Sequence, residues 1–189
     1  MANEGLMKLF TDQLQDIYYV EKQLVRSLNR MARAAQNEDL RAAFEQHREE
    51  TENQMERLEE VFASLDRNAK GKKCEAMDGI LEEAKELMED FEDDVALDAA
   101  LVAAAQKVEH YEIATYGSLC AWAEQLGLEE ALPLLEETLQ EEKKTDQDLT
   151  ELAVSLLNLQ ADLEEDEEGA EMPTASAGGN GSSGSRSRS

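Results

Sequence analysis

Four long segments of the chain carry apolar residues at alternating steps of four and three, the spacing that gathers side chains on one face of an α-helix. In the first segment this apolar stripe consists of Phe10, Leu14, Ile17, Leu24, Leu28 and Met31, with Glu21 at its centre. Strong helix formers such as Ala, Leu and Glu dominate the sequence. Because no alternation of β-branched residues is long enough to predict a sheet, we expect an all-α fold.

Capping residues indicate where the helices begin and end. Asn37 is a suitable N-cap for the second helix, and Asp93 and Asp94 are suitable caps for the third long one. Gly127 is a typical helix terminator, and Pro133 falls in the first turn of the last helix, where a missing N–H costs least. The sequence therefore predicts helices at residues 4–35, 39–65, 75–91, 93–125 and 128–159.

The helix expected at residues 75–91 is short and lies between two pairs of long helices. A long middle crossover of this kind distinguishes a ferritin-like bundle from a simple up-and-down bundle. We predict that residues 1–160 form a ferritin-like four-helix bundle with a short extra helix in the middle crossover. An acidic run followed by Gly and Ser residues predicts a disordered tail at residues 161–189.

The strongly negative charge narrows the classes of partner. A formal net charge of -26 would repel the phosphates of nucleic acid rather than neutralise them. No apolar run approaches the length of a membrane span, and the first residues lack the basic and then apolar pattern of a signal peptide. We therefore expect a cytoplasmic protein that binds neither nucleic acid nor membranes.

Acidic residues interrupt the apolar stripes at a common depth. Glu21, Glu112 and Glu142 each stand near the centre of a stripe, and the second helix offers His47 with either Glu50 or Thr51 beside it. A single glutamate in such a stripe commonly reaches solvent, and a single core histidine is commonly only hydrogen-bonded. Four carboxylates cannot be buried together as bare anions, however, because each would lose roughly several kcal/mol of solvation. They must share protons or surround cations.

Two divalent metals would balance four carboxylates, as in dinuclear carboxylate bundles. Oxygen ligands with an imidazole suit iron or manganese better than zinc. Glu109 stands one helical turn before Glu112 and is a further candidate ligand. The sequence therefore predicts a dinuclear metal site between the helices, with iron favoured and manganese as the alternative.

Five stretches of this chain resemble the YciE/YciF family of ferritin-like stress proteins. They are DIYYVEKQL (16–24), FEQHREETENQMERLE (44–59), KKCEAMDGI (72–80), DAALVAAAQKVEHYEIATYGSL (98–119) and LLEETLQEEKKTD (134–146). The resemblance implies a ferritin-like fold, a homodimer and a dinuclear site similar to that of rubrerythrin-type proteins. Carried over by position, that site draws on Glu21, His47, Glu50, Glu109, Glu112 and Glu142.

The chain departs from the usual ferritin-like ligand pattern in two of its helices. The usual order is Glu-x-x-His on the second and fourth long helices, whereas here His47 precedes Glu50. Thr145 occupies the place where a histidine would follow Glu142. A second metal would therefore have fewer nitrogen ligands, which leaves the identity of the metal and the rate of iron oxidation open.

Two functions follow from these observations. The first is a di-iron protein of the ferroxidase or peroxidase type, in which two Fe(II) ions react with O₂ or peroxide. In this hypothesis Glu50 and Glu142 bridge the metals, while Glu21 and Glu112 are terminal ligands. The alternative is a non-catalytic helical stress or interaction protein whose metal site is structural or empty.

The excess of acidic residues also predicts adaptation to high salt, since dissolved ions screen the repulsion between like charges. We expect a higher melting temperature in multimolar KCl than in low salt, measured by circular dichroism. Equal melting temperatures in the two conditions would contradict this prediction.

Overall fold

The computed structural model describes the backbone of residues 2–170 and the side chains of residues 3–155. It contains helices α1 (Ala2–Ala34), α2 (Glu38–Ser64), α3 (Glu75–Asp90), α4 (Leu97–Leu126) and α5 (Ala131–Ala170), and no strand within the described backbone. The prediction of an all-α fold is thus confirmed. None of the helices in the described part combines the length and apolarity that a bilayer crossing needs.

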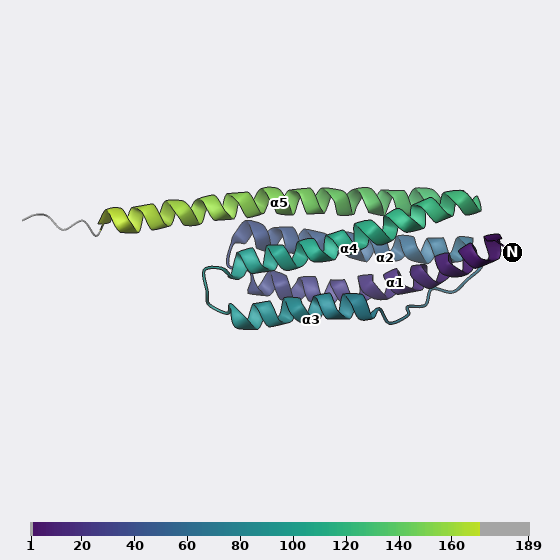
Figure 1. The fold of residues 1–189 in the computed structure, drawn as a ribbon, viewed down its shortest axis with the longest axis horizontal. Coiled ribbons are helices and arrows are strands. Elements are labelled where there is room, and N and C mark those ends of the chain that lie inside the picture. The colour runs from purple at the N-terminus through teal and green to yellow at the C-terminus, as the bar shows by residue number, and fades with distance from the viewer. Residues whose placement is uncertain (1, 171–189) are drawn as a thin grey trace, which may run out of the picture. The chain divides into compact units, whose positions relative to one another are not determined.

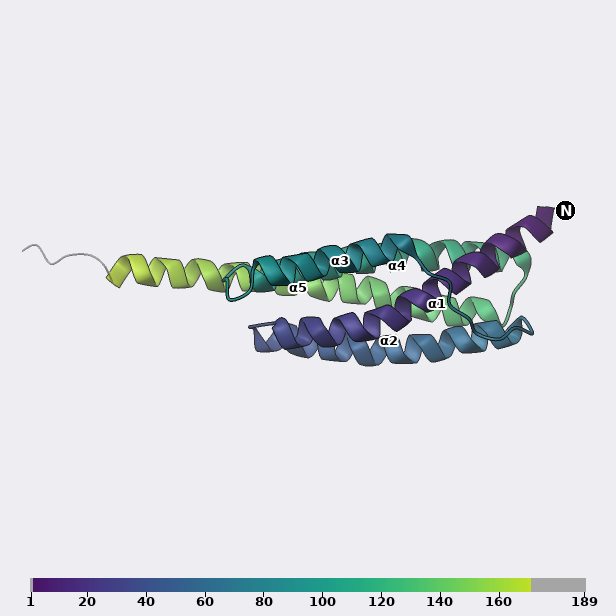
Figure 2. The ribbon, with the colours of Figure 1, turned by 90° about the horizontal axis from the view of Figure 1, so that it is seen from below.

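The chain divides into two units, Met1–Leu157 and Asn158–Ser189. In the first unit, α1 and α2 pack against each other, and α1 also packs against α4 (Figures 1 and 2). The short helix α3 lies along α4 and contacts α1, so the crossover between the two helix pairs is itself helical. Side chains of α5 bind both α2 and α4, as in the Arg57–Glu141 ion pair and the Gln106–Thr150 hydrogen bond. The predicted four-helix bundle with a short extra helix is confirmed.

Several helix ends follow from single residues that the sequence identifies. The Asn37 side chain accepts hydrogen bonds from the backbone N–H groups of Asp39 and Leu40, which confirms it as the N-cap of α2. Gly127 ends α4 with a left-handed φ of 70°, a conformation that costs glycine little. Pro133 lies in the first turn of α5, as predicted.

The predicted start of α4 is wrong. The helix begins at Leu97, and its N-cap Ala96 makes no side-chain hydrogen bond. The Asp94 side chain instead accepts from the backbone N–H of Ala96, and Asp93 has a left-handed φ of 62°. Aspartates tolerate such local turns because their short side chains bond the neighbouring backbone. The two acids therefore form the turn before the helix rather than its cap.

The last helix also ends later than residue 159. The backbone from residue 158 to Ala170 is helical, and the Leu, Glu and Ala residues of this stretch all favour helix. The rest of the tail predicted at residues 161–189 lies outside the described residues.

The core stripes confirm most of the predicted buried residues. The whole α1 stripe from Phe10 to Met31, including Glu21, is at most 3% exposed. In the second half of α4, the same steps counted from Glu112 select Thr115, Leu119 and Trp122. Leu119 is buried, but Thr115 and Trp122 are only partly so, and the neighbouring Tyr116 and Ala123 are buried instead. A straight helix has 3.6 residues per turn, so a stripe drawn at alternating steps of three and four drifts off the buried face.

A buried carboxylate joins the α1–α2 turn to α4. Asp98 is 7% exposed and accepts hydrogen bonds of 2.8 Å from the backbone N–H groups of both Gln36 and Asn37. These N–H groups belong to the turn and have no partner within a helix, and the carboxylate of Asp98 is their acceptor. Asp98 thereby fixes the hairpin of α1 and α2 relative to α4.

We predict that Asp98→Ala lowers the free energy of unfolding by about 1–3 kcal/mol, because it leaves two N–H groups without their acceptor. Urea denaturation followed by circular dichroism measures the change. Glu124→Ala, an exposed carboxylate on the same helix, is the control and should stay within about 0.5 kcal/mol of the wild type. Equal stability of the two variants would contradict this role of Asp98.

Candidate metal centre

Four potential metal ligands from three helices converge in the core of the bundle. They are His47 of α2, Glu109 and Glu112 of α4, and Glu142 of α5, and one ligand atom from each lies within 4.8 Å of the others. All four residues are buried. Glu109 and Glu112 are three residues apart, so they stand one turn apart on the same face of α4.

The His47 ring stands between two of these acids. Its Nδ1 atom is 3.4 Å from Glu109 Oε1, and its Nε2 atom is 3.7 Å from Glu142 Oε2. Neither ring nitrogen has a hydrogen-bond partner among the described residues, although the side chain is only 3% exposed. An imidazole placed this way can offer a nitrogen lone pair to a cation.

Glu21 of α1 adjoins this group and adds a fourth carboxylate. The Tyr116 hydroxyl donates a hydrogen bond to its Oε1 atom, while Oε2 has no partner within the described part of the chain. Both oxygens of Glu112 and both of Glu109 are likewise buried and unpartnered there. Since buried polar groups are almost always satisfied, this concentration of unsatisfied oxygens requires protons or cations.

Glu142 is held by a polar network on its other side. The Gln54 amide donates to Glu142 Oε1 and, at 3.0 Å, to Glu141. Arg57 in turn donates to both Glu141 oxygens, at 2.8 and 2.6 Å. The chain Arg57–Glu141–Gln54–Glu142 therefore orients one carboxylate of the group, as second-layer residues do around metals.

Burial shifts the proton equilibria of these acids in a consistent way. Loss of solvation, and next the charge of Glu142, raise the pKa of Glu21 to about 8. Loss of solvation followed by the charges of neighbouring glutamates raises the pKa values of Glu109 and Glu112 well above the ordinary range. Burial also opposes ionisation of Glu142, but the nearby His47 ring, and then the hydrogen bond from Gln54, lower the pKa of Glu142 overall.

These residues fit a divalent metal site. They supply four carboxylates and one imidazole, and their unpartnered atoms face one another rather than solvent. Two divalent cations would balance the four carboxylate charges, and oxygen-rich ligand sets with an imidazole suit iron and manganese. The buried His and Glu group could therefore hold a metal.

The structure brings together five of the six ligands predicted from the sequence and places Glu50 apart. Glu50 is partly exposed, accepts a 2.9 Å hydrogen bond from Gln46, and is not one of the four converging residues. The buried stripe of α2 passes through Thr51 instead, which was the other reading of that position. A ligand role for Glu50 stays a prediction that the geometry of the buried group does not support.

Two polar partners of the acids were not predicted as site residues. Tyr116 stands four residues after Glu112 and thus on the same face of α4. Gln54 is buried on the face of α2 that also carries His47 and Thr51. A buried amide or hydroxyl in a stripe that also carries acids was the available signal.

Comparisons with known proteins agree on one family. A family model described as "Domain of unknown function (DUF892)" matches residues 5–162. Protein YciF of Escherichia coli (strain K12) is 53% identical over 164 residues, which cover 86% of this chain and 98% of that protein.

Solved structures of similar chains share the fold. The Escherichia coli stress protein YciF matches with 51% identity and a TM-score of 0.78, over 81% of this chain and 97% of that one. YcfI, described as a putative structural protein from Rhodopseudomonas palustris, matches with 44% identity and a TM-score of 0.75, over 77% and 92%. A protein from Xanthomonas campestris is 26% identical with a TM-score of 0.63, over 86% and 97%.

We predict that the metal-free protein loses stability as the pH rises from about 5 to about 8. The folded state keeps the proton of Glu21 up to a pKa of about 8, whereas the unfolded chain releases it near the ordinary value of 4.5. Between these values the folded state binds more protons, so the free energy of unfolding falls by up to about 1.4 kcal/mol per pH unit for this one group. Urea denaturation in the presence of a chelator measures the slope.

In the isosteric variant Glu21→Gln the free energy of unfolding should decrease less steeply with pH, because glutamine has no proton that titrates in this range. Glu56→Gln, an exposed change on α2, should keep the wild-type slope. Identical slopes in all three proteins would show that Glu21 titrates normally and would contradict its assignment to a desolvated site.

Proposed function

The chain belongs to the DUF892 family, and from this membership and the buried His and Glu group we propose that it is a dinuclear-metal stress protein that reacts Fe(II) with O₂ or peroxide. The observation that carries the proposal is the convergence of His47, Glu109, Glu112 and Glu142 within 4.8 Å in a buried core. Similarity to a relative described as a stress protein supports the physiological setting.

The buried acids and His47 would form ligand sets for two ions. His47, Glu109, Glu112 and Glu142 would hold the first, and Glu21, which adjoins Glu112, would complete the ligand set for the second. Bound iron would supply the electrons that reduce O₂ or peroxide. Release of protons from Glu21, Glu109 and Glu112 accompanies metal binding, because carboxylates bind metals in their ionised form.

Other side chains restrain this arrangement and keep water from it. The hydrogen bonds from Tyr116 to Glu21 and from Gln54 to Glu142 fix one oxygen of each carboxylate. Apolar residues of the α1 stripe flank Glu21 on both sides, with Ile17 and Leu24 at most 2% exposed. In such a dry site the attraction between carboxylate and cation is stronger than it would be in water.

A non-catalytic role is the second candidate. Burial, as the first cause, raises the pKa of Glu21, and a protonated Glu21 at neutral pH is consistent with a site that holds no metal. A relative of 44% identity is described as a putative structural protein. If this role is the correct one, Fe(II)-loaded protein mixed with peroxide will give no fast ferric absorbance change. The homodimer and the cytoplasmic location stay predictions.

We predict about two ions per chain after anaerobic loading with Fe(II) and desalting, measured by elemental analysis. The double variant Glu21→Gln/Glu112→Gln should hold less than about half of that amount, since it removes two of the four balancing charges. Glu124→Gln on the exposed face of α4 is the matched control and should bind as the wild type does.

Melting curves of the three proteins establish that all are folded. Failure of the wild type to retain iron, or equal retention by the double variant, would overturn the proposed function.

A further inference from the structure

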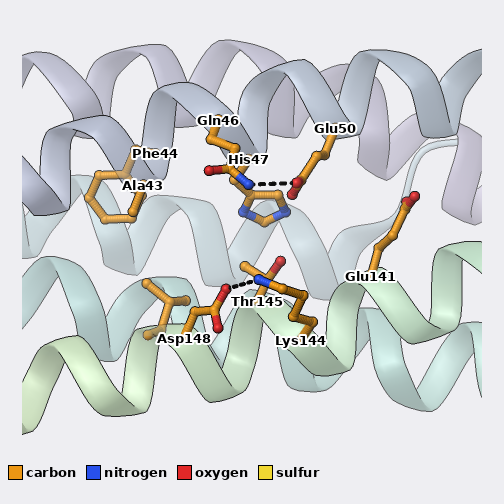
Figure 3. A pocket seen from close by; sticks show the side chains of 10 residues that line it. Ala43, Phe44, Gln46, His47, Glu50, Glu141, Lys144, Thr145 and Asp148 are labelled. Carbon is orange, nitrogen blue, oxygen red and sulfur yellow. Dashed lines mark hydrogen bonds and ion pairs between the residues drawn. The ribbon is translucent and has the colours of Figure 1, made fainter.

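A surface pocket between α2 and α5 reaches the buried ligand group. It is lined by residues of both helices, including Gln46, His47 and Glu50 of α2, and Lys144 and Thr145 of α5 (Figure 3). Its volume of about 90 Å³ has room for several water molecules. Lys144 is exposed and Thr145 is half-buried, so the pocket opens to solvent at one side and deepens toward the core.

His47 forms the inner wall of this pocket. Its ring lies in the space between Glu50 and Thr145 (Figure 3). The same ring belongs to the converging ligand group and lies 3.4 Å from Glu109 and 3.7 Å from Glu142. One buried imidazole with two unpartnered nitrogens therefore separates solvent from the metal ligands.

The acids that line the pocket differ in how far they are neutralised. Arg57 donates to both oxygens of Glu141, and Lys144 forms an ion pair with Asp148. Glu50 accepts its 2.9 Å hydrogen bond from the neutral amide of Gln46 (Figure 3). Lys144 also attracts Glu50, but its direct ion pair is with Asp148. Among the acids that line the pocket, Glu50 is therefore the one that forms no direct ion pair within the described part of the chain, and the three acids still outnumber the single lysine there.

We propose that this pocket is the access route for divalent cations, with the Glu50 carboxylate as the transient binding group that delivers them to His47. This inference rests on the proposed function, because it needs ions to reach the buried group. A carboxylate at the mouth attracts and partly dehydrates a hard cation, and the imidazole behind it provides the next ligand on the way inward. Electrostatic funnels of this kind raise association rates by about 10- to 1000-fold.

A role in cation entry explains why Glu50 lies in this pocket although it does not join the buried ligand group. A permanent ligand would change the affinity for the ion when removed. A group used only in passage changes the rates of binding and release together and leaves the affinity nearly unaltered. This difference separates the present inference from the sequence-based assignment of Glu50 as a bridging ligand.

The experiment follows Co(II) binding to the metal-free full chain by stopped-flow visible absorbance, and Kd by equilibrium titration. Glu50→Gln keeps the shape and the Gln46 hydrogen bond but removes the charge. We expect it to load and release Co(II) about tenfold more slowly, with a Kd within about twofold of the wild type. Glu49→Gln is the matched control, because Glu49 is the adjacent glutamate of α2, is 71% exposed and does not line the pocket.

A second pair of variants tests the route by shape rather than by charge. Thr145→Leu fills the pocket and should also slow loading by about tenfold, whereas Thr145→Ser keeps it open and should load at the wild-type rate. Loading of Thr145→Leu and Glu50→Gln at the wild-type rate would overturn the access route.

A weakened Kd with faster release in Glu50→Gln would make Glu50 a ligand and would also overturn the inference. Neither result would touch the proposed function, because the wild type would still bind the metal. Absence of equilibrium binding by the wild type would remove both proposals.

Discussion

The structure depends on how four carboxylates are accommodated in an apolar helical core. Glu21, Glu109, Glu112 and Glu142 are all buried, and each would lose roughly several kcal/mol of solvation as a bare anion. This loss of solvation, followed by repulsion between the charges, raises the pKa values of Glu21, Glu109 and Glu112. Any state of this protein must therefore supply protons or cations at this place, and the bundle provides His47, Tyr116 and Gln54 as further partners.

The fold brings the buried acids and His47 from four helices to the same level of the core. The α1 stripe presents Glu21, α4 presents Glu109 and Glu112, and α2 and α5 add His47 and Glu142. Asp98 anchors the α1–α2 turn to α4 and so helps to hold the two helix pairs in register. On the α2–α5 side the His47 ring lies between the other ligands and a surface pocket, which is the side we propose for access of cations.

Much of the fold and most of the site could be predicted from the sequence, because apolar periodicity and burial are linked by simple helix geometry. Glu21 and Glu112 were recognised because a charged residue in an otherwise apolar stripe is costly. The choice between Glu50 and Thr51 stayed open in the sequence, because neighbouring positions of a helix point roughly 100° apart and sequence alone does not fix the rotation of α2. In the structure Thr51 is buried and Glu50 is partly exposed. The partnership of Tyr116 with Glu21 joins residues 95 positions apart, so it required the tertiary structure.

The most direct test of the account is anomalous diffraction from crystals of the protein grown with Mn(II), recorded on both sides of the manganese absorption edge. The account predicts strong anomalous peaks between His47, Glu109, Glu112 and Glu142, with a further peak beside Glu21. Manganese found only at surface carboxylates, with the buried acids hydrogen-bonded to one another, would contradict it and would identify the core acids as protonated structural groups.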